Sequence, residues 1–206
     1  MNQTRWNRLR YTLYTPIYDW IAKHFAVYRE RSIQLLEIQE GDKVLISGAG
    51  SGLDLPYINA KAQITAIDIT PSMISALEER AEKLNLVVNA QVMDGQKLAF
   101  PDNHFDAVIL HLILAVIPDP VACLQEAERV TKSGGKLVVF DKFLPDNKQP
   151  NMVRRVLNLF TNLLATDINR KMGVLLANTH LELIKQEAAA LNGTFQIYLL
   201  KKEEQQ

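Results

Sequence analysis

Three glycines at alternate positions follow the first apolar run of the chain, in the stretch KVLISGAGSGLDL. Gly48, Gly50 and Gly52 let the backbone approach a ligand closely, and a glycine-rich turn after a first strand is typical of nucleotide-type cofactor sites. The G-x-G-x-G spacing differs from the G-x-G-x-x-G of dinucleotide sites, and Asp54, near the expected start of a following helix, would repel a pyrophosphate. The loop therefore favours the amino-acid or nucleoside part of a cofactor.

Two carboxylates follow the next two apolar runs. Asp68 stands 20 residues after Gly48, where a carboxylate can accept hydrogen bonds from both hydroxyls of a ribose. Asp94, with Gly95 beside it, is placed to accept from the exocyclic amine of an adenine. Simpler interpretations are a helix cap for Asp68, ahead of Pro71, and a turn for Asp94-Gly95. Three such features in order, each at the carboxyl end of a strand, favour one shared cofactor site.

The segments that must position these residues alternate between strands and helices. Apolar runs with little alternation indicate strands that are buried on both faces of a parallel sheet. We expect strands at 43–47, 63–68, 86–93, 105–114 and 135–143, and helices at 71–85 and 119–132. Asn192-Gly193 is a strong hairpin signal between two further apolar runs. The sequence therefore predicts an α/β, Rossmann-like doubly wound sheet with an antiparallel C-terminal hairpin.

The length of the chain suits a single domain. Its 206 residues, 48% of them hydrophobic, suffice for one well-buried α/β core and little more. We expect one domain over 1–206, with an N-terminal helical cover (1–40), a cofactor-binding core (41–141), a helical lid (142–180) and a C-terminal hairpin (181–202).

The motifs resemble those of the class I S-adenosylmethionine-dependent methyltransferases. The resemblance covers residues 43–141 and lies in SGAGSGLDLP, AIDITPSM, MDGQKLAFPDNHFDAVIL and IPDPVACLQEAERVTKSGGKLVVFD. The last stretch is similar to the branch of quinone-biosynthesis C-methyltransferases and bacterial phosphatidylethanolamine N-methyltransferases. The resemblance implies a seven-stranded sheet, S-adenosyl-L-methionine as cofactor and S-adenosyl-L-homocysteine as product.

The resemblance also implies a place for each part of the cofactor. The glycine loop would lie against the methionine moiety, the first carboxylate would bind the ribose, and the second would lie at the adenine edge. The residues concerned are Gly48, Ala49, Gly50 and Gly52 in the loop, Asp68 for the ribose, Ile69 and Met73 beside the adenine, and Asp94 and Gly95 at its edge.

Ser47 departs from the family pattern. The family usually has Asp or Glu at this position, which fixes the ammonium group of the cofactor. Because a serine accepts only an uncharged hydrogen bond, the substitution could weaken cofactor binding by about 1–2 kcal/mol. A catalytically silent cofactor-binding protein is therefore an alternative to an active enzyme.

Two N-terminal tyrosines add a candidate closing segment. Tyr14 and Tyr18 share a helix face because they are spaced i, i+4 in YTPIYD. The pattern resembles the segment by which this branch closes over its cofactor, so both are cofactor-binding candidates and Tyr18 is also a catalytic candidate. The alternative is an aromatic stripe that packs on the sheet.

Methyl transfer is an in-line displacement, which needs a general base only if the acceptor carries a proton. His111, at the end of the expected strand 105–114, is the candidate for lining the reaction centre. It could equally be a hydrogen-bonded core residue. The other histidines are scattered and Cys123 is the single cysteine, so no metal site is expected. The Pro-Pro dipeptide context of amino-methylating DNA enzymes is absent after this strand, which argues against a nucleic acid substrate.

Charge is unevenly distributed along the chain. Residues 1–31 and 142–172 each carry a formal net charge of +4, whereas residues 32–141 carry −7. Both basic segments also carry apolar residues at helical spacing, so they could form an entrance for a small or lipid-like acceptor at an anionic membrane surface. The simpler interpretation is that basic surface helices pair with the acidic body.

We therefore expect a cytoplasmic methyltransferase that could also associate peripherally with a membrane. We expect its oligomeric state to be a monomer or a homodimer. The candidate acceptors are an amine, a phospholipid head group and a quinone-like ring. The alternatives are a silent cofactor-binding or membrane-surface protein and a Rossmann oxidoreductase. The glycine spacing disfavours the oxidoreductase. We find no signal peptide and no apolar run of about 20 residues.

Overall fold

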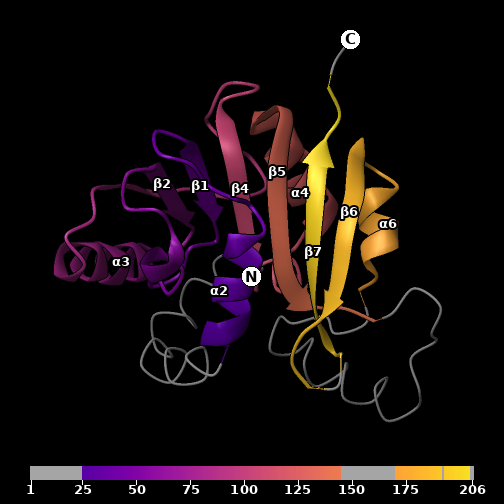
Figure 1. Cartoon of the computed structure of the whole chain (residues 1–206), viewed down its shortest axis with the longest axis horizontal. Coiled ribbons are helices and arrows are strands. Elements are labelled where there is room, and N and C mark those ends of the chain that lie inside the picture. Colours follow the sequence, from indigo (N-terminus) through magenta and orange to yellow (C-terminus); the bar gives the residue numbers. More distant parts are fainter. Residues whose placement is uncertain (1–24, 145–169, 192, 205–206) are drawn as a thin grey trace.

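The computed structural model describes residues 25–144, 170–191 and 193–204. A seven-stranded sheet in the order β3-β2-β1-β4-β5-β7-β6 forms its centre (Figure 1). The strands are β1 (Lys43–Ser47), β2 (Gln63–Asp68), β3 (Val88–Val92), β4 (Phe105–His111), β5 (Thr131–Lys142), β6 (Leu181–Ala188) and β7 (Phe195–Lys202). The helices are α2 (Ala26–Gln34), the short 3-10 helix η1 (Leu55–Tyr57), α3 (Pro71–Lys83), α4 (Pro120–Val130) and α6 (Met172–Leu176).

Strands β1 to β5 pair in parallel, whereas β7 pairs antiparallel with both β5 and β6. The central strands are apolar on both faces because helices cover both faces, as a parallel sheet requires. The predicted doubly wound sheet and its reversed C-terminal hairpin are confirmed. Of the predicted Asn192-Gly193 turn, only Gly193 lies within the described residues, and its φ of 81° suits a tight turn.

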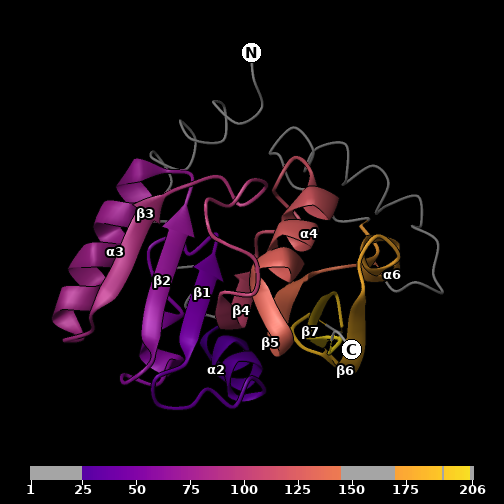
Figure 2. The ribbon, with the colours of Figure 1, turned by 90° about the horizontal axis from the view of Figure 1, so that it is seen from above.

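The core is divided by the sheet into two layers. On one face, Leu77 of α3 and Ile33 of α2 pack with alternate residues of β1, β2, β4 and β5. On the other face, Leu124 of α4 and Leu175 of α6 pack with the remaining alternate residues of the same sheet. Figure 2 shows the sheet edge-on between these helices. Successive side chains at the ends of β1 and β4 therefore point alternately into one core layer and the other.

Two expectations about elements need correction or fall outside the described residues. The helix expected directly after the glycine loop is replaced by the three-residue η1, because the chain becomes extended at Ile58, with φ −92° and ψ 142°. Most of the predicted lid (142–180) and the first 24 residues of the predicted cover (1–40) lie outside the described residues. Within the described part of the chain, no helix is both long and apolar enough to cross a bilayer.

Candidate functional site

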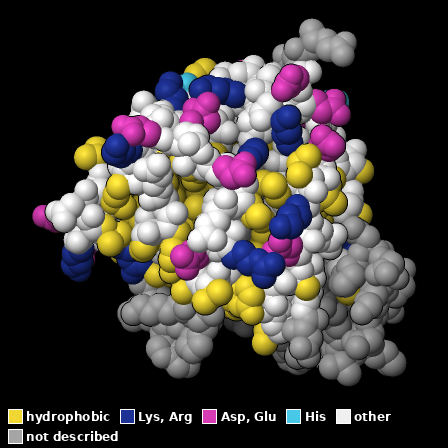
Figure 3. All heavy atoms as spheres, viewed as in Figure 1, with side chains coloured by type: hydrophobic (Ala, Val, Ile, Leu, Met, Phe, Trp, Pro, Cys, Tyr) yellow, Lys and Arg dark blue, Asp and Glu magenta, His cyan; other side chains and the backbone are white. Residues whose placement is uncertain are grey.

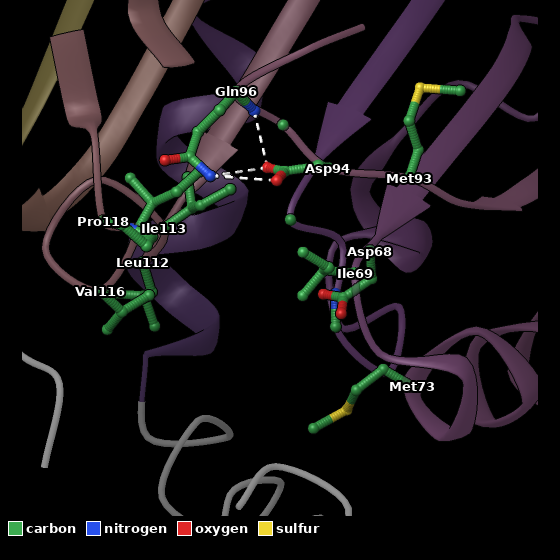
Figure 4. A pocket seen from close by; sticks show the side chains of 14 residues that line it. Asp68, Ile69, Met73, Met93, Asp94, Gln96, Leu112, Ile113, Val116 and Pro118 are labelled. Carbon is green, nitrogen blue, oxygen red and sulfur yellow. Dashed lines mark hydrogen bonds between the residues drawn. The ribbon is translucent and has the colours of Figure 1, made fainter. Parts of the chain in front are cut away.

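A cavity lies at the carboxyl ends of the parallel strands, where the chain order of the sheet reverses between β1 and β4. This is the switch point at which open α/β sheets bind ligands. Its described lining residues come from four consecutive strand ends: Gly48 and Gly50; Asp68, Ile69 and Met73; Met93, Asp94, Gly95 and Gln96; and Leu112, Ile113, Val116, Ile117 and Pro118. The last group is called the apolar wall below. Figure 4 shows its side chains across the cavity from Asp68, Ile69 and Met73.

The structure brings seven of the predicted site residues together in this cavity: Gly48, Gly50, Asp68, Ile69, Met73, Asp94 and Gly95. Ser47, Ala49, Gly52 and His111 are not among the described lining residues. Tyr14 and Tyr18 lie outside the described residues, so both stay predictions.

Gly48 and Gly52 serve different purposes in the loop. A Cβ atom on Gly48 would lie 2.4 Å from Cδ1 of Ile113, so the absence of a side chain lets the apolar wall pack against the loop. A Cβ atom on Gly52 would lie 3.0 Å from side-chain atoms of both Leu55 and Leu77. Gly48 therefore shapes the cavity, whereas Gly52 allows the loop to pack on the core.

Asp68 ties the glycine loop to the end of β2. One carboxylate oxygen accepts from the amide of Gly50 and the other from the amide of Thr70, each at 2.9 Å. Burial raises the pKa of Asp68, against the opposing effect of these amide donors. The cap of α3 is Thr70, so Asp68 is not its N-cap. Each carboxylate oxygen still has a lone pair that can accept a hydroxyl from the cavity.

Asp94 is held by Gln96, a lining residue that sequence reasoning missed. The side-chain amide of Gln96 donates to both Asp94 oxygens, at 2.9 and 3.1 Å (Figure 4). The Gln96 carbonyl oxygen accepts from the Asp119 amide at 2.8 Å, at the start of α4. Gln96 thereby links the third strand end to the next helix, and nothing in the sequence other than its proximity to Asp94 signals this role.

His111 has a different place from the one expected. Its Nδ1 lies 2.7 Å from Oδ1 of Asp54 and its Nε2 lies 2.9 Å from Oγ of Ser32, and all three side chains are buried. Arg29 donates to the same Asp54 oxygen at 2.7 Å. His111 faces the α2 layer because it alternates with Leu110 along β4. The ring is therefore a structural core residue in this conformation and does not line the cavity.

The pKa of Asp54 follows from this network. Complete burial would raise it, but the charge of Arg29 and the hydrogen bonds from His111 and Arg29 outweigh burial and hold the Asp54 pKa well below its usual range. Asp54 does stand at a helix start, directly before η1. The expectation that it repels an anion in the site is wrong, because its carboxylate points into the core and pairs there with Arg29 and His111.

Ser47, at the end of β1, is only 1% exposed, and its hydroxyl oxygen has no hydrogen-bond partner in the structure. The space where Gly95 would carry a Cβ atom lies 2.9 Å from this oxygen. A buried polar atom without a partner costs about 1–3 kcal/mol. The hydroxyl therefore lies behind Gly95, next to the cavity but not in its described lining.

The apolar wall begins with a strained residue. Leu112 follows β4 directly and has a φ of 58°, in the left-handed region that costs an L-residue roughly 1–2 kcal/mol. Its amide still donates to the Phe140 carbonyl at 2.8 Å, so the sheet pairing extends to this residue. Backbone strain of this kind is often found at ligand sites, and no sequence pattern marked it.

The described lining carries two carboxylates and one carboxamide, and the remainder is glycine, proline or apolar. Such a cavity favours a ligand with hydroxyl or amine donors, a positive charge and an apolar body. No group of three or more His, Cys, Asp or Glu residues that could hold a metal occurs among the described residues. Burial raises the pKa of the Cys123 thiol to about 12, which leaves it unreactive.

Sequence comparisons agree with this chemistry. A family model described as a methyltransferase domain matches residues 45–139. A phosphatidylethanolamine N-methyltransferase from Cereibacter sphaeroides is 31% identical over 157 residues, which cover 75% of this chain and 77% of that protein. A demethylmenaquinone methyltransferase from Corynebacterium glutamicum is 37% identical over 120 residues, which cover 58% of this chain and 50% of that protein. The chain thus spans only about half the length of the second relative.

Solved structures share the fold at low sequence identity. A geranyl diphosphate C-methyltransferase from Streptomyces coelicolor, in complex with S-adenosyl-L-homocysteine, has a TM-score of 0.70 and 14% identity, over 87% of this chain and 80% of that one. The cyclase SpnF has a TM-score of 0.74 and 16% identity, over 87% and 81% of the two chains. Since a cyclase shares the architecture, the fold alone does not determine the chemistry.

Proposed function

Because the chain belongs to the S-adenosylmethionine-dependent methyltransferases, we propose that it transfers the cofactor's methyl group to a lipid-like acceptor, either the amine of a phospholipid head group or a quinone-like ring. The observation that carries this proposal is the apolar wall, which faces the carboxylates Asp68 and Asp94 across one cavity. The apolar part of a lipid-like acceptor could pack against this wall while its reactive group meets the cationic methyl donor. The relative that acts on a phospholipid supports the same choice.

The lining residues fit the cofactor. Asp68 has free lone pairs for the ribose hydroxyls, and Ile69 and Met73 offer an apolar surface to the adenine beside it. Asp94 can accept from the adenine amine, in competition with Gln96. Gly48 and Gly50 leave open backbone for the methionine part, and two carboxylates suit a ligand that carries a sulfonium and an ammonium.

When bound, S-adenosylmethionine supplies an activated methyl group, so the protein has little covalent chemistry to perform. Its residues must orient the acceptor in line with the carbon–sulfur bond and exclude water. The apolar wall can exclude water and pack against an apolar acceptor, and its described side chains carry no nucleophile that would compete for the methyl group. His111 has no direct part in this proposal.

A panel assay tests the acceptor. The full chain, S-adenosylmethionine and one acceptor at a time would be incubated, and the product detected by mass shift of one methyl group. Phosphatidylethanolamine vesicles, a demethylated naphthoquinone with an isoprenoid tail, and a small soluble amine cover the three classes. Transfer to either lipid acceptor supports the proposal, and transfer to the soluble amine alone contradicts it.

A silent cofactor-binding protein is the second candidate, favoured by Ser47 in place of the usual acid. It predicts that S-adenosylhomocysteine binds in calorimetry while none of the three acceptors is methylated. The Rossmann oxidoreductase considered from the sequence does not fit the family to which the chain belongs.

Binding to an anionic membrane surface is part of the proposal and rests on the two basic segments, which lie mostly outside the described residues. Co-sedimentation with vesicles tests it directly. Binding to anionic but not neutral vesicles, weakened by salt and by changing Arg5, Arg8 and Arg10 together to Gln, supports a membrane-surface site. If the protein binds neither anionic nor neutral vesicles, the acceptor must be delivered in solution.

A further inference from the structure

The apolar wall is held in place by two charged side chains from distant parts of the chain. The Ala115 amide donates to Oδ2 of Asp141 at 2.8 Å. The guanidinium of Arg170 donates through Nη1 to the Leu114 carbonyl and through Nη2 to the Ile117 carbonyl, the latter at 2.9 Å. These three backbone groups belong to the loop that forms the apolar wall, and the position of that loop depends on both side chains.

The loop has little secondary structure of its own to fix its position. Its internal hydrogen bonds form a single turn, in which the amides of Val116 and Ile117 both donate to the Ile113 carbonyl, at 3.0 and 2.9 Å. Leu112, at its beginning, is in a strained conformation. A loop with a strained beginning and one turn keeps its position only where outside groups hold it.

Both side chains suit this task. Asp141 is completely buried at the end of β5, and its second oxygen accepts from the Lys142 amide at 2.8 Å. Arg170 lies two residues before the start of α6, and its backbone carbonyl accepts from the Leu144 amide at 2.9 Å. A planar guanidinium can bridge two carbonyls in fixed geometry, whereas a lysine ammonium is a single flexible point charge.

The position of the wall matters because it touches the glycine loop. Cδ1 of Ile113 lies 2.4 Å from the place where a Cβ atom on Gly48 would stand, so there is no spare space between wall and loop. The carboxylate anchors Asp68 and Asp94 come from other strand ends (Figure 4). A shift of the wall would therefore change the space next to the glycine loop while leaving Asp68, which is held by the amides of Gly50 and Thr70, in place.

Building on the proposed function, we infer that Arg170 and Asp141 are positioning residues for methyl transfer, which set the distance and angle at which the acceptor meets the methyl donor. Neither side chain is among the described lining residues of the cavity. Their substitution should affect catalysis more than cofactor binding, because it moves the wall and leaves the ribose anchor Asp68 unchanged.

The kinetic test compares Arg170→Gln, Arg170→Lys and Asp141→Asn with the wild type. The donor is S-adenosylmethionine and the acceptor probe is vesicles of phosphatidylethanolamine with phosphatidylglycerol. Since a misplacement of about 1 Å can cost about 100-fold in rate, kcat should fall roughly 10- to 100-fold in Arg170→Gln while the Kd for S-adenosylhomocysteine changes less than about threefold. Arg170→Lys should recover only part of the loss, and it replaces Arg170→Gln if that variant does not fold.

The matched control is Lys61→Gln, which removes a cation from an exposed ion pair with Glu40, whose two side chains are each 68% exposed. It should leave kcat and Kd unchanged. An unchanged kcat in both Arg170 variants, or a loss of cofactor affinity as large as the loss of kcat, would overturn the inference.

A second measurement does not depend on the acceptor. In the complex with S-adenosylhomocysteine, the δ1-methyl resonances of Ile113 and Ile117 should shift in the Arg170 variants and stay in place in Lys61→Gln. If the wild type methylates no acceptor, the proposed function fails, and these resonances still decide whether Arg170 sets the position of the wall. Unchanged resonances would show that it does not.

Discussion

At the scale of single residues, Ser47 is the clearest departure from the pattern that the sequence predicts. Its hydroxyl is buried without a partner, so the protein carries a cost at this position in the absence of ligand. A cost of this kind is explained if a ligand group completes the hydrogen bond. The Ser47 hydroxyl occupies the space where a Cβ atom on residue 95 would stand, which gives a physical reason for glycine at position 95.

Replacement of Ser47 by Ala separates these effects. Removing an unsatisfied buried hydroxyl should raise the free energy of unfolding of the unliganded protein by about 1 kcal/mol. If the hydroxyl accepts from the cofactor, the Kd for S-adenosylhomocysteine should rise about fivefold in the same variant. Denaturant melts and calorimetry measure the two quantities, and higher stability with unchanged affinity would remove Ser47 from the site.

Asp68 gives a second prediction at this scale. In Asp68→Asn the side-chain NH2 would face one of the two amides that now donate to the carboxylate, from Gly50 and Thr70. Loss of charged hydrogen bonds costs about 1.5–3 kcal/mol, so cofactor affinity should fall at least tenfold. Calorimetry with S-adenosylhomocysteine measures it.

Asp102→Asn is the matched control, since the same chemical change then falls on a side chain that is 69% exposed. The pH dependence has a definite sign. Because burial raises the pKa of Asp68 above its usual 3.8, the carboxylate is protonated sooner as pH falls, and affinity should decline in acid before an ordinary Asp would titrate. Equal affinities of Asp68→Asn and wild type would contradict the ribose assignment.

At the scale of elements, the glycine loop and the apolar wall depend on each other. Gly48→Ala combines a positive φ of 73° with a Cβ atom 2.4 Å from Ile113, so it must move the wall. We expect it to lower the free energy of unfolding by roughly 2–4 kcal/mol and to abolish measurable methyl transfer. Thermal melts and the transfer assay check this.

Gly41→Ala isolates the backbone contribution in that experiment. Gly41 has a φ of 85°, yet a Cβ atom there would meet nothing within 4 Å. It should cost only about 1 kcal/mol and leave activity intact. If both alanine variants lose equal stability and keep equal activity, the contact between Gly48 and Ile113 has no functional importance.

The sequence predicted elements better than contacts. The five parallel strands and the final hairpin follow from apolar runs and turn residues, which are local signals. The α-helix expected after the glycine loop is a failure of the same approach, because the glycine-turn motif did not show that the chain becomes extended at Ile58 after the three-residue η1. Boundaries moved by a few residues, as at Val130, where α4 ends and β5 begins at once.

The sequence predicted those lining residues whose place follows from their own position at a strand end, and it missed those that depend on a distant partner. Asp68 and Asp94 stand at strand ends, and a parallel sheet brings strand ends together. Gln96, Arg170 and the partners of His111 could not be found in this way, since each acts through a pairing between residues distant in sequence. The separations are 23 residues from Gln96 to Asp119, 56 from Arg170 to Leu114 and 79 from Ser32 to His111. A histidine after a buried strand looks the same in sequence whether its ring enters the cavity or the opposite layer of the core.

At the scale of the whole molecule, the buried network of Arg29, Asp54, His111 and Ser32 joins α2 to the segment after the glycine loop and to the end of β4. These three segments are distant in sequence and lie at the face of the sheet that α2 covers (Figure 1). Figure 3 shows the outer surface of that side of the molecule, where Lys, Arg, Asp and Glu side chains are interspersed among hydrophobic and uncharged ones. The charges of the network, by contrast, are inside, where breaking a buried ion pair is costly.

The last prediction concerns acid stability. Because the folded-state pKa of Asp54 lies below its usual 3.8, the ionised carboxylate stabilises the fold at pH values above 3.8, and this contribution is lost progressively as pH falls from there toward the lower pKa. Asp54→Asn keeps the shape but removes the buried carboxylate to which Arg29 donates, and should lower the free energy of unfolding by about 3–5 kcal/mol at neutral pH. Its stability should then fall less steeply than that of the wild type below pH 3.8.

Glu40→Gln, at an exposed pair with Lys61, serves as control and should change stability by no more than about 1 kcal/mol. Denaturant titrations from pH 7 to pH 2.5 measure all three proteins, and parallel pH profiles for Asp54→Asn and wild type would show that the network does not determine the acid limit of the fold.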